Sequence, residues 1–210
     1  MISIKQSKDY KTLMYSEGYI QGRSHVSGNL SLLYMKEMVK IFNIEDPKHI
    51  CILGLGAGNM HSYLLKKFPG LHIDTVEINP EIVEIAKKEF DLPNTKRLRI
   101  FIEDVKEFIK ERHNYDIVFV DVYNESGQVF LDDRWLKKQG KIIVYNSLVN
   151  KDTYHSYMAQ LNTLYNRVVE QYKPELNNLE YNHIAFCYND YQVCRLTIER
   201  VIQIGRIVNY

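Results

Sequence analysis

The chain has 210 residues, enough for one well-buried core but too few for two large ones, so we expect one domain with a small appendage. Its 27 basic and 26 acidic side chains nearly cancel, and the basic pairs are scattered without a long basic stripe. Nucleic acid is therefore not an expected partner. The sequence starts without a signal-peptide apolar stretch and has no apolar run near the ~20 residues of a membrane span, so we predict neither secretion nor membrane insertion.

The cysteines and histidines follow no pattern of a disulfide framework or a metal site. Cys51, Cys187 and Cys194 are odd in number and have no Cys-x-x-Cys spacing, which favours reduced, mostly structural thiols in a cytoplasmic protein. The seven histidines never fall into a ligand spacing such as His-x-x-x-His. We therefore predict no metal.

The N-terminal part of the chain differs in character from the rest. We predict a β-hairpin around residues 16–18, then a polar loop through Gly28 and a helix between about 32 and 41 with apolar residues at helical spacing. This divides the chain into an N-terminal hairpin and helix extension, residues 1–44, and a main domain, residues 45–210.

From residue 50 onward, short runs of β-branched residues alternate with helical stretches, the pattern of a parallel sheet covered by helices. The predicted strands are 50–53, 72–77, 98–102, 115–120 and 140–145, with a closing pair at 183–187 and 193–198. The predicted helices are 60–67, 105–112, 153–168 and one with Asn79 as N-cap and Pro80 in its first turn. The expected fold is α/β, with a Rossmann-like, doubly wound and mostly parallel sheet.

A glycine-rich turn follows the first of these strands. Gly54, Gly56 and Gly58 allow a tight turn and a close approach of the backbone to a ligand, because no Cβ stands in the way. Dinucleotide folds have glycine at the sixth place of this turn, where Asn59 stands here, and no Walker lysine follows. The spacing therefore favours a ligand of the S-adenosylmethionine type over NAD. The alternative is a turn that only links a strand to a helix.

Acidic and polar side chains follow the next strands where each of them ends. Glu77 ends the second strand, Asp104 follows the third, and Asp121, Tyr123 and Asn124 follow the fourth. Ligands of open parallel sheets bind at these carboxyl ends. Helix capping is the alternative for each carboxylate taken singly. Together with the glycine turn, the three acids predict a nucleoside site.

Five segments carry a resemblance to a known family. They are Tyr-Met-Lys-Glu-Met at 34–38, the glycine turn at 54–59, Val-Glu-Ile-Asn-Pro at 76–80, Glu-Asp at 103–104 and the run 115–121. In order and spacing they resemble the spermidine synthase (polyamine aminopropyltransferase) family, which is built on the class I methyltransferase fold. The likeness covers residues 13 to 150. It implies S-adenosylmethionine or its decarboxylated form as co-substrate, and a homodimer.

The resemblance also implies a role for each candidate site residue. Glu77 would bind the ribose hydroxyls, and Asp104 would bind the adenine amino group. Asp121 would match the aspartate that helps to deprotonate the attacking amine, because an ammonium cannot attack a sulfonium-activated carbon until it loses a proton. The implied acceptor is a small amine, and its side of the site would hold the predicted substrate-binding residues Gln21, Tyr123 and Asn124.

The sequence departs from the family pattern in ways that leave the reaction open. Ala57 stands where the family has an aspartate in the glycine turn, and Asn124 is neutral where the family has a second acid. Three hypotheses follow. The first is an aminopropyltransferase-like enzyme with Asp121 as base. The second is a methyltransferase or aminocarboxypropyl transferase that uses ordinary S-adenosylmethionine. The third is a non-catalytic nucleoside-binding relative.

Overall fold

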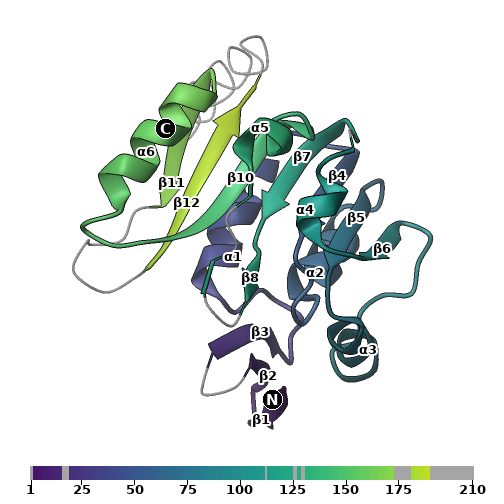
Figure 1. The fold of residues 1–210 in the computed structure, drawn as a ribbon. Helices are drawn as coiled ribbons and strands as arrows, with labels where there is room; N and C mark the ends of the chain where they lie inside the picture. The colour runs from purple at the N-terminus through teal and green to yellow at the C-terminus, as the bar shows by residue number, and fades with distance from the viewer. Residues whose placement is uncertain are drawn as a thin grey trace, which may run out of the picture.

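The computed structural model describes residues 2–15, 19–111, 113–124, 127–128, 131–172 and 181–189. In this part of the chain the centre of the molecule is a seven-stranded sheet with helices on both faces (Figure 1). Its strands, in chain order, are β4 (His49–Leu53), β5 (His72–Glu77), β6 (Leu98–Ile102), β7 (Tyr115–Val120), β10 (Gly140–Val149), β11 (Arg167–Tyr172) and β12 (Tyr181–Tyr188).

The order of the strands across the sheet is β11-β12-β10-β7-β4-β5-β6. The five strands from β10 to β6 are parallel, and β12 lies antiparallel between β10 and β11. The chain builds outward from β4 through β5 to β6, then returns to place β7 on the other side of β4. The switch point, where ligands of such sheets bind, therefore lies between the carboxyl ends of β4 and β7. The predicted doubly wound, mostly parallel α/β fold is confirmed.

The strands are apolar on both faces because helices cover both. Along β4, Ile50 and Ile52 face a core shared with α2, whereas Cys51 and Leu53 face the opposite core, beneath α6. Such double burial explains the continuous apolar runs that made the strands recognisable in the sequence. The helical elements are α1 (Leu33–Met38), the 3₁₀ helix η2 (Val39–Asn43), α2 (Asn59–Lys67), α3 (Pro80–Glu89), α4 (Val105–Phe108), α5 (Asp133–Leu136) and α6 (Tyr154–Leu164). In the described ranges no helix is long and apolar enough to cross a membrane.

A separate three-stranded antiparallel sheet comes first in the chain: β1 (Ser3–Gln6), β2 (Tyr10–Tyr15) and β3 (Tyr19–His25). The predicted hairpin is the β2–β3 pair, and its turn at 16–18 lies outside the described residues. This small sheet lies at the end of the molecule where β7 finishes (Figure 1). The helix after it packs on the large sheet, since Met38 and Ile41 belong to the core with Ile50. The division at residue 44 stays a prediction.

Two predicted helices end earlier than the sequence pattern suggested. The helix predicted at 105–112 is α4, which stops at Phe108 and continues only as short turns to Glu111. The helix predicted at 153–168 is α6, which stops at Leu164. Val168, placed in that helix by its spacing, lies instead in β11, an edge strand that was not predicted. The backbone N–H of Asn166 donates to the carbonyl of Tyr188, so pairing with β12 replaces the helical bonds here.

Strand β10 is longer than predicted. It runs past residue 145 to Val149, because β12 pairs with it from Ile142 to Val149. The predicted strand 183–187 is confirmed within β12. Its predicted partner, 193–198, lies outside the described residues. Two short strands, β8 (Tyr123–Asn124) and β9 (Gly127–Gln128), form a small ladder beyond β7.

Candidate functional site

The glycine turn is wedged between β7 and β3. Gly54 has φ +97° and Gly56 has φ +54°, both in the left-handed region that favours glycine. A Cβ at Gly54 would collide with the backbone oxygen of Asp121, and a Cβ at Gly56 with the backbone oxygen of Gln21. Gly58, with φ +72°, forms the N-cap of α2. The turn therefore brings together three of the segments predicted to form the site.

Strand β3 covers the turn from the N-terminal side. Ala57 is buried, and a Cβ built on Gly22 would lie 2.5 Å from the Ala57 Cβ and 2.8 Å from its backbone nitrogen. The Asn59 side chain donates a hydrogen bond to the Ser24 hydroxyl in the same strand. The position of the family's aspartate is thus filled by a methyl group that packs directly against backbone.

Glu77 lies at the end of β5, beside the glycine turn. Its Oε2 accepts a hydrogen bond from the Leu55 backbone N–H at 3.2 Å, and its Oε1 accepts one from the Asn79 N–H at 2.9 Å. The carboxylate thereby joins the turn after β4 to the start of α3. A carboxylate has about four acceptor sites, so two hydrogen bonds leave others for a ligand.

Asp104 is the N-cap of α4, as the capping alternative anticipated. Its Oδ1 accepts a hydrogen bond from the Lys106 backbone N–H at 2.8 Å. Two large apolar side chains remain exposed at the neighbouring strand ends: Ile78, just after β5, is 65% exposed, and Ile102, at the end of β6, is 54% exposed. The β5–β6 side of the sheet end thus combines an acid with uncovered apolar surface.

Asp121 is held in place by hydrogen bonds from two other side chains. Its Oδ1 accepts a hydrogen bond from the Asn146 side-chain amide at 2.8 Å, and the Tyr34 hydroxyl of α1 donates to the same carboxylate. Burial raises the pKa of Asp121 to about 6, although both hydrogen bonds act to lower it. Burial also raises the pKa of Tyr34 well above its ordinary value, and the charge of Asp121 raises it further. The hydroxyl of Tyr34 therefore stays protonated and able to donate.

The three predicted substrate-side residues contact three different segments. The Tyr123 hydroxyl donates to the backbone carbonyl of Asn146 at 3.0 Å. Gln21 contributes its backbone oxygen beside Gly56, and Asn124 pairs with Gly127 in the β8–β9 ladder. The Asn124 side chain lies outside the described part of the structure.

Asn146 and Tyr34 are site residues that the sequence did not identify. Asn146 follows the last residue of the strand predicted at 140–145, so the rule that pointed to Glu77 and Asp121 would also have found it. Tyr34 belonged to a quoted motif without a role, and only the packing of α1 on the sheet brings its hydroxyl to Asp121.

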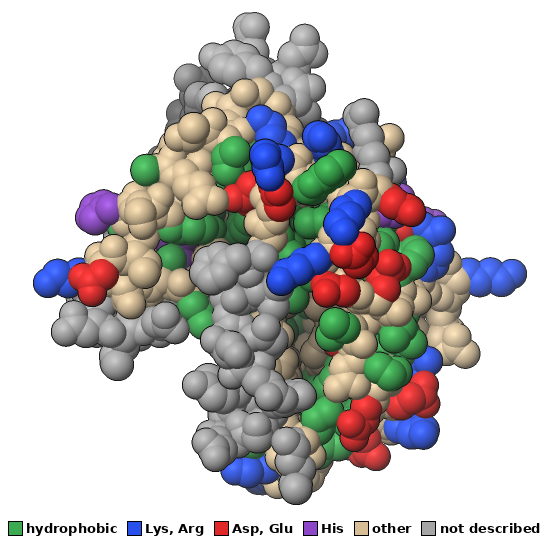
Figure 2. Space-filling view, in the orientation of Figure 1, with side chains coloured by type: hydrophobic (Ala, Val, Ile, Leu, Met, Phe, Trp, Pro, Cys, Tyr) green, Lys and Arg blue, Asp and Glu red, His purple; other side chains and the backbone are tan. Residues whose placement is uncertain are grey.

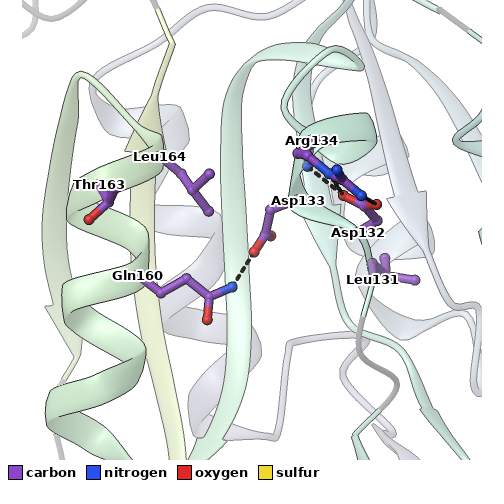
Figure 3. Close-up of a pocket in the computed structure, with 7 residues that line it drawn as sticks. All are labelled: Leu131, Asp132, Asp133, Arg134, Gln160, Thr163 and Leu164. Carbon is purple, nitrogen blue, oxygen red and sulfur yellow. Dashed lines mark hydrogen bonds and ion pairs between the residues drawn. The ribbon is translucent and has the colours of Figure 1, made fainter.

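Charged side chains cover the surface (Figure 2), and one concavity lies away from the strand ends. Acidic and basic side chains are interspersed over the face drawn in Figure 2. A cavity of about 450 Å³ lies between α5 and α6, away from the glycine turn. In it Gln160 reaches across to Asp133, and Arg134 lies against Asp132 (Figure 3). Among the described residues no group of three or more histidines, cysteines or acids could hold a metal ion.

The strand order, with a glycine turn and an acid at the switch point, defines a protein of the class I methyltransferase fold. A family model, the spermine/spermidine synthase domain, matches residues 34–163, which is more than half of the chain. The chain belongs to this family.

Curated relatives include two kinds of transferase. An eEF1A lysine and N-terminal methyltransferase homolog of Drosophila melanogaster is 32% identical over 124 residues, which cover 56% of this chain and 17% of that protein. A polyamine aminopropyltransferase of Neisseria meningitidis (serogroup A / serotype 4A) is 28% identical over 137 residues, covering 62% of this chain and 51% of that protein. The chain thus spans about half or less of the length of these relatives.

Solved structures share the fold. A probable spermidine synthase from Corynebacterium glutamicum superposes with a TM-score of 0.74 at 17% identity, over 90% of this chain and 77% of that one. Human methyltransferase-like protein 13, in complex with SAH, gives a TM-score of 0.61 at 19% identity, over 83% and 90%. Identities this low establish the fold and not the reaction.

Proposed function

We propose that the chain is a spermidine synthase-like transferase that moves an aminopropyl-type group from decarboxylated S-adenosylmethionine to a small amine. The observation that carries this proposal is Asp121, whose backbone oxygen lies against Gly54 of the glycine turn and whose carboxyl has a pKa of about 6. Such a group is mostly ionised at neutral pH and still basic enough to take a proton, the compromise that a general base requires.

Three features support the proposal that the adenosyl part of the donor binds at the strand ends. The glycine turn allows close approach of backbone to ligand. Glu77 keeps acceptor capacity for a ribose diol beyond its two backbone hydrogen bonds. Ile78 and Ile102 present the apolar surface that a planar base covers, and Asp104 follows β6 closely and is proposed to accept from the amino group of that base.

The chemistry then needs a neutral amine next to the donor's sulfonium. The amine lone pair attacks the carbon beside sulfur, the carbon–sulfur bond breaks, and its electron pair stays on sulfur as a neutral thioether nucleoside. Asp121 accepts the proton that the amine gives up, and its negative charge also attracts the cationic acceptor. Tyr34 and Asn146 hold the carboxylate in place. Gln21, Tyr123 and Asn124 are proposed for the acceptor side.

A second candidate reaction follows from the contact between Ala57 and Gly22. No carboxylate stands at this position of the turn, and the backbone of β3 fills the space beside it. A donor with its own carboxylate would therefore meet no repulsion from residue 57. This favours ordinary S-adenosylmethionine, as the substrate of a methyltransferase or an aminocarboxypropyl transferase. The relative from Drosophila melanogaster is named a methyltransferase.

One assay separates these reactions. Purified protein is incubated with each donor and a panel of amines, and the nucleoside products are identified by mass spectrometry. Methylthioadenosine formed from the decarboxylated donor supports the proposal, whereas the same product from the ordinary donor means aminocarboxypropyl transfer. S-adenosylhomocysteine as the sole product would refute alkyl transfer in favour of methylation. No turnover with either donor would leave the non-catalytic, nucleoside-binding hypothesis.

The chain offers a matched control on β7, the strand that Asp121 directly follows. Asp116 lies in β7, where it accepts from the Lys48 and His49 backbone N–H groups and pairs with Lys141. Asp116→Asn should retain turnover, and Asp121→Asn should lose about 100-fold or more. Equal rates in the two variants would remove Asp121 from the mechanism.

A homodimer in the cytoplasm completes the proposal. Its support is the family membership for the dimer and the buried free thiols of Cys51 and Cys187 for the compartment. Light scattering of the purified chain tests the dimer, and microscopy of the tagged protein in its own cell tests the cytoplasmic location. A monomeric mass, or a signal in a secreted fraction, would contradict these expectations.

A further inference from the structure

A chain of hydrogen bonds reaches Asp121 from the far side of β10. The Asn182 side chain, on β12, donates to the side-chain oxygen of Asn146 at 2.9 Å, and the Asn146 amide donates to Asp121 Oδ1 at 2.8 Å. Asn146 is 1% exposed, so its amide has little access to water as a substitute partner. The side chains of β12 and β10 are thereby joined to the residue that directly follows β7.

The chemistry of the groups fixes the direction of this chain. An ionised carboxylate only accepts hydrogen bonds, so Asn146 must turn its NH₂ group toward Asp121. The carbonyl oxygen of the same amide then points away from the carboxylate and needs a donor. Asn182 supplies that donor. The opposite orientation of Asn146 would place its oxygen against Asp121 and leave two acceptors facing each other.

Backbone hydrogen bonds fix the position of Asn146, the middle residue of the three. Asn146 pairs with Ile184 in the β10–β12 ladder, and its backbone carbonyl also accepts from the Tyr123 hydroxyl. Asn182 pairs with Leu148 in the same ladder, so its side chain reaches Asn146 diagonally. Although these contacts fix the backbone of Asn146, its side-chain amide can still rotate by a half-turn and exchange the positions of its oxygen and its NH₂ group. Asn182 is the described residue that opposes this half-turn.

We propose that Asn182 is a positioning residue for the transfer reaction, acting through Asn146 to keep a hydrogen-bond donor on Asp121 and so to keep the base ionised and oriented. This inference rests on the proposed function of Asp121. Asn182 itself touches neither donor nor acceptor in this scheme. The antiparallel strand β12 thus takes part in the site although it lies two strands from β7.

Loss of Asn182 has a defined electrostatic consequence. The Asn146 amide becomes free to rotate, and its NH₂ group no longer always faces the carboxylate. A hydrogen bond to the charged form lowers a carboxyl pKa, so its weakening raises the pKa of Asp121 above about 6. Among the described residues, Tyr34 on α1 faces this carboxylate and Tyr123 on β8 contacts Asn146, and neither is changed by the substitution.

The test is a titration of the Asp121 carboxyl carbon by NMR in protein labelled with ¹³C at aspartate. Disappearance of the signal in Asp121→Asn assigns it. Asn182→Leu removes the donor, and Asn182→Asp replaces it with an acceptor of the same size, which carries the test if the leucine variant does not fold. We expect the titration midpoint to rise by roughly half a unit or more in Asn182→Leu and further in Asn182→Asp.

Asn189 provides the matched control at the opposite end of β12. Its side chain donates to the backbone carbonyls of Lys137 and Gly140, so Asn189→Leu should reduce stability without moving the Asp121 titration. Unchanged midpoints in both Asn182 variants, or equal shifts in the Asn189 variant, would overturn the inference.

The titration needs no turnover, so it separates this inference from the proposed function. If the wild-type protein is active, the acid limb of kcat/KM should move to higher pH in the Asn182 variants, while kcat well above the limb stays near the wild-type value. If the wild-type protein is inactive but the titration shifts as expected, the proposed reaction fails and the positioning of Asp121 stands.

Discussion

Replacing Gly54 with alanine tests the geometry that joins the glycine turn to the end of β7. A residue other than glycine at φ +97° costs about 1 to 3 kcal/mol in backbone strain alone. The new Cβ would also overlap the carbonyl oxygen of Asp121 and lie 3.2 Å from its carbon, so one of the two segments must move. The smaller entropy of the unfolded alanine chain offsets only about 0.4 to 1 kcal/mol.

Relieving the overlap adds about 1 to 3 kcal/mol, so the expected net loss in the free energy of unfolding is about 1 to 5 kcal/mol, measured by urea denaturation. Calorimetry with methylthioadenosine should also show at least a tenfold weaker binding, because the shift displaces the backbone that the ligand approaches. Gly70→Ala is the control, since a Cβ there meets nothing within 4 Å, and it should stay within about 0.5 kcal/mol of wild type. Equal stability and equal binding in the two variants would refute the geometry.

The remaining predictions concern a buried acid, an apolar surface and an ion pair. Asp121→Asn should stabilise the fold by about 2 to 3 kcal/mol at pH 7, because the raised pKa of Asp121 makes its ionised form costly in the folded state. Below pH 3.8 the Asp121 carboxyl is protonated in both the folded and the unfolded protein, so the wild type carries no such cost. The cost of the ionised form grows as the pH rises from 3.8 through about 6, so the stabilities of the two proteins should converge near pH 4 in urea titrations. Ile102→Asn should weaken methylthioadenosine binding about 5- to 30-fold in calorimetry without loss of stability, since this side chain is already exposed. Arg99→Met should cost about 1 to 3 kcal/mol in urea denaturation at pH 7, because it leaves Asp74 buried beside Tyr115 without its cation.

The pKa of Asp74 determines how the stability contributed by the Arg99–Asp74 ion pair changes with pH. Burial acts to raise the pKa of Asp74, but hydrogen bonds from Arg99 and Tyr115 outweigh it and hold the pKa below the ordinary 3.8. Its stabilising contribution is therefore present above pH 3.8 and lost as the pH falls below it. The cost of Arg99→Met should shrink in acid. A cost that stays constant down to pH 3 would contradict this assignment.

Each of the other two predictions has its own control. Ile4, at 37% exposure in β1, is an exposed isoleucine away from the strand ends, and Ile4→Asn should leave nucleoside binding unchanged. Arg134 pairs with Asp132 on the surface, and Arg134→Met should leave stability at the wild-type value. If Asp121→Asn were less stable than wild type at pH 7, burial would not be the dominant influence on that carboxyl.

The sequence predicted elements whose signals are local. Asn79 caps α3 through a hydrogen bond from Glu81, with Pro80 in the first turn, as the order of those residues indicates. The strands predicted at 72–77, 98–102 and 115–120 have those bounds in the structure, because each apolar run is bounded by polar turns. The missed strand β11 shows the limit of such signals. Val168 fits both a helical stripe from Leu161 and a strand, and pairing with a distant segment decides between them.

The positions of the candidate site residues in the fold were predictable where these residues lie at strand ends. Glu77, Asp104 and Asp121 all lie at the carboxyl ends of parallel strands, where the pattern places them. The partner Asn182 depends on how β12 inserts beside β10, a contact between residues 36 positions apart in the chain. The contact of Gly22 with Ala57 likewise depends on how β3 packs on the turn. No periodicity encodes contacts of this kind.

In the proposed reaction, Asp121 accepts the proton of an amine while an S-adenosyl donor alkylates that amine at the glycine turn. Its most direct test is the rate of methylthioadenosine release from the decarboxylated donor, measured against pH for the wild-type protein with its best amine. We predict that kcat/KM rises with pH through a midpoint near 6, the pKa of Asp121, and that this limb is absent from the residual activity of Asp121→Asn. The same limb in both proteins, or no methylthioadenosine from either, would contradict the account.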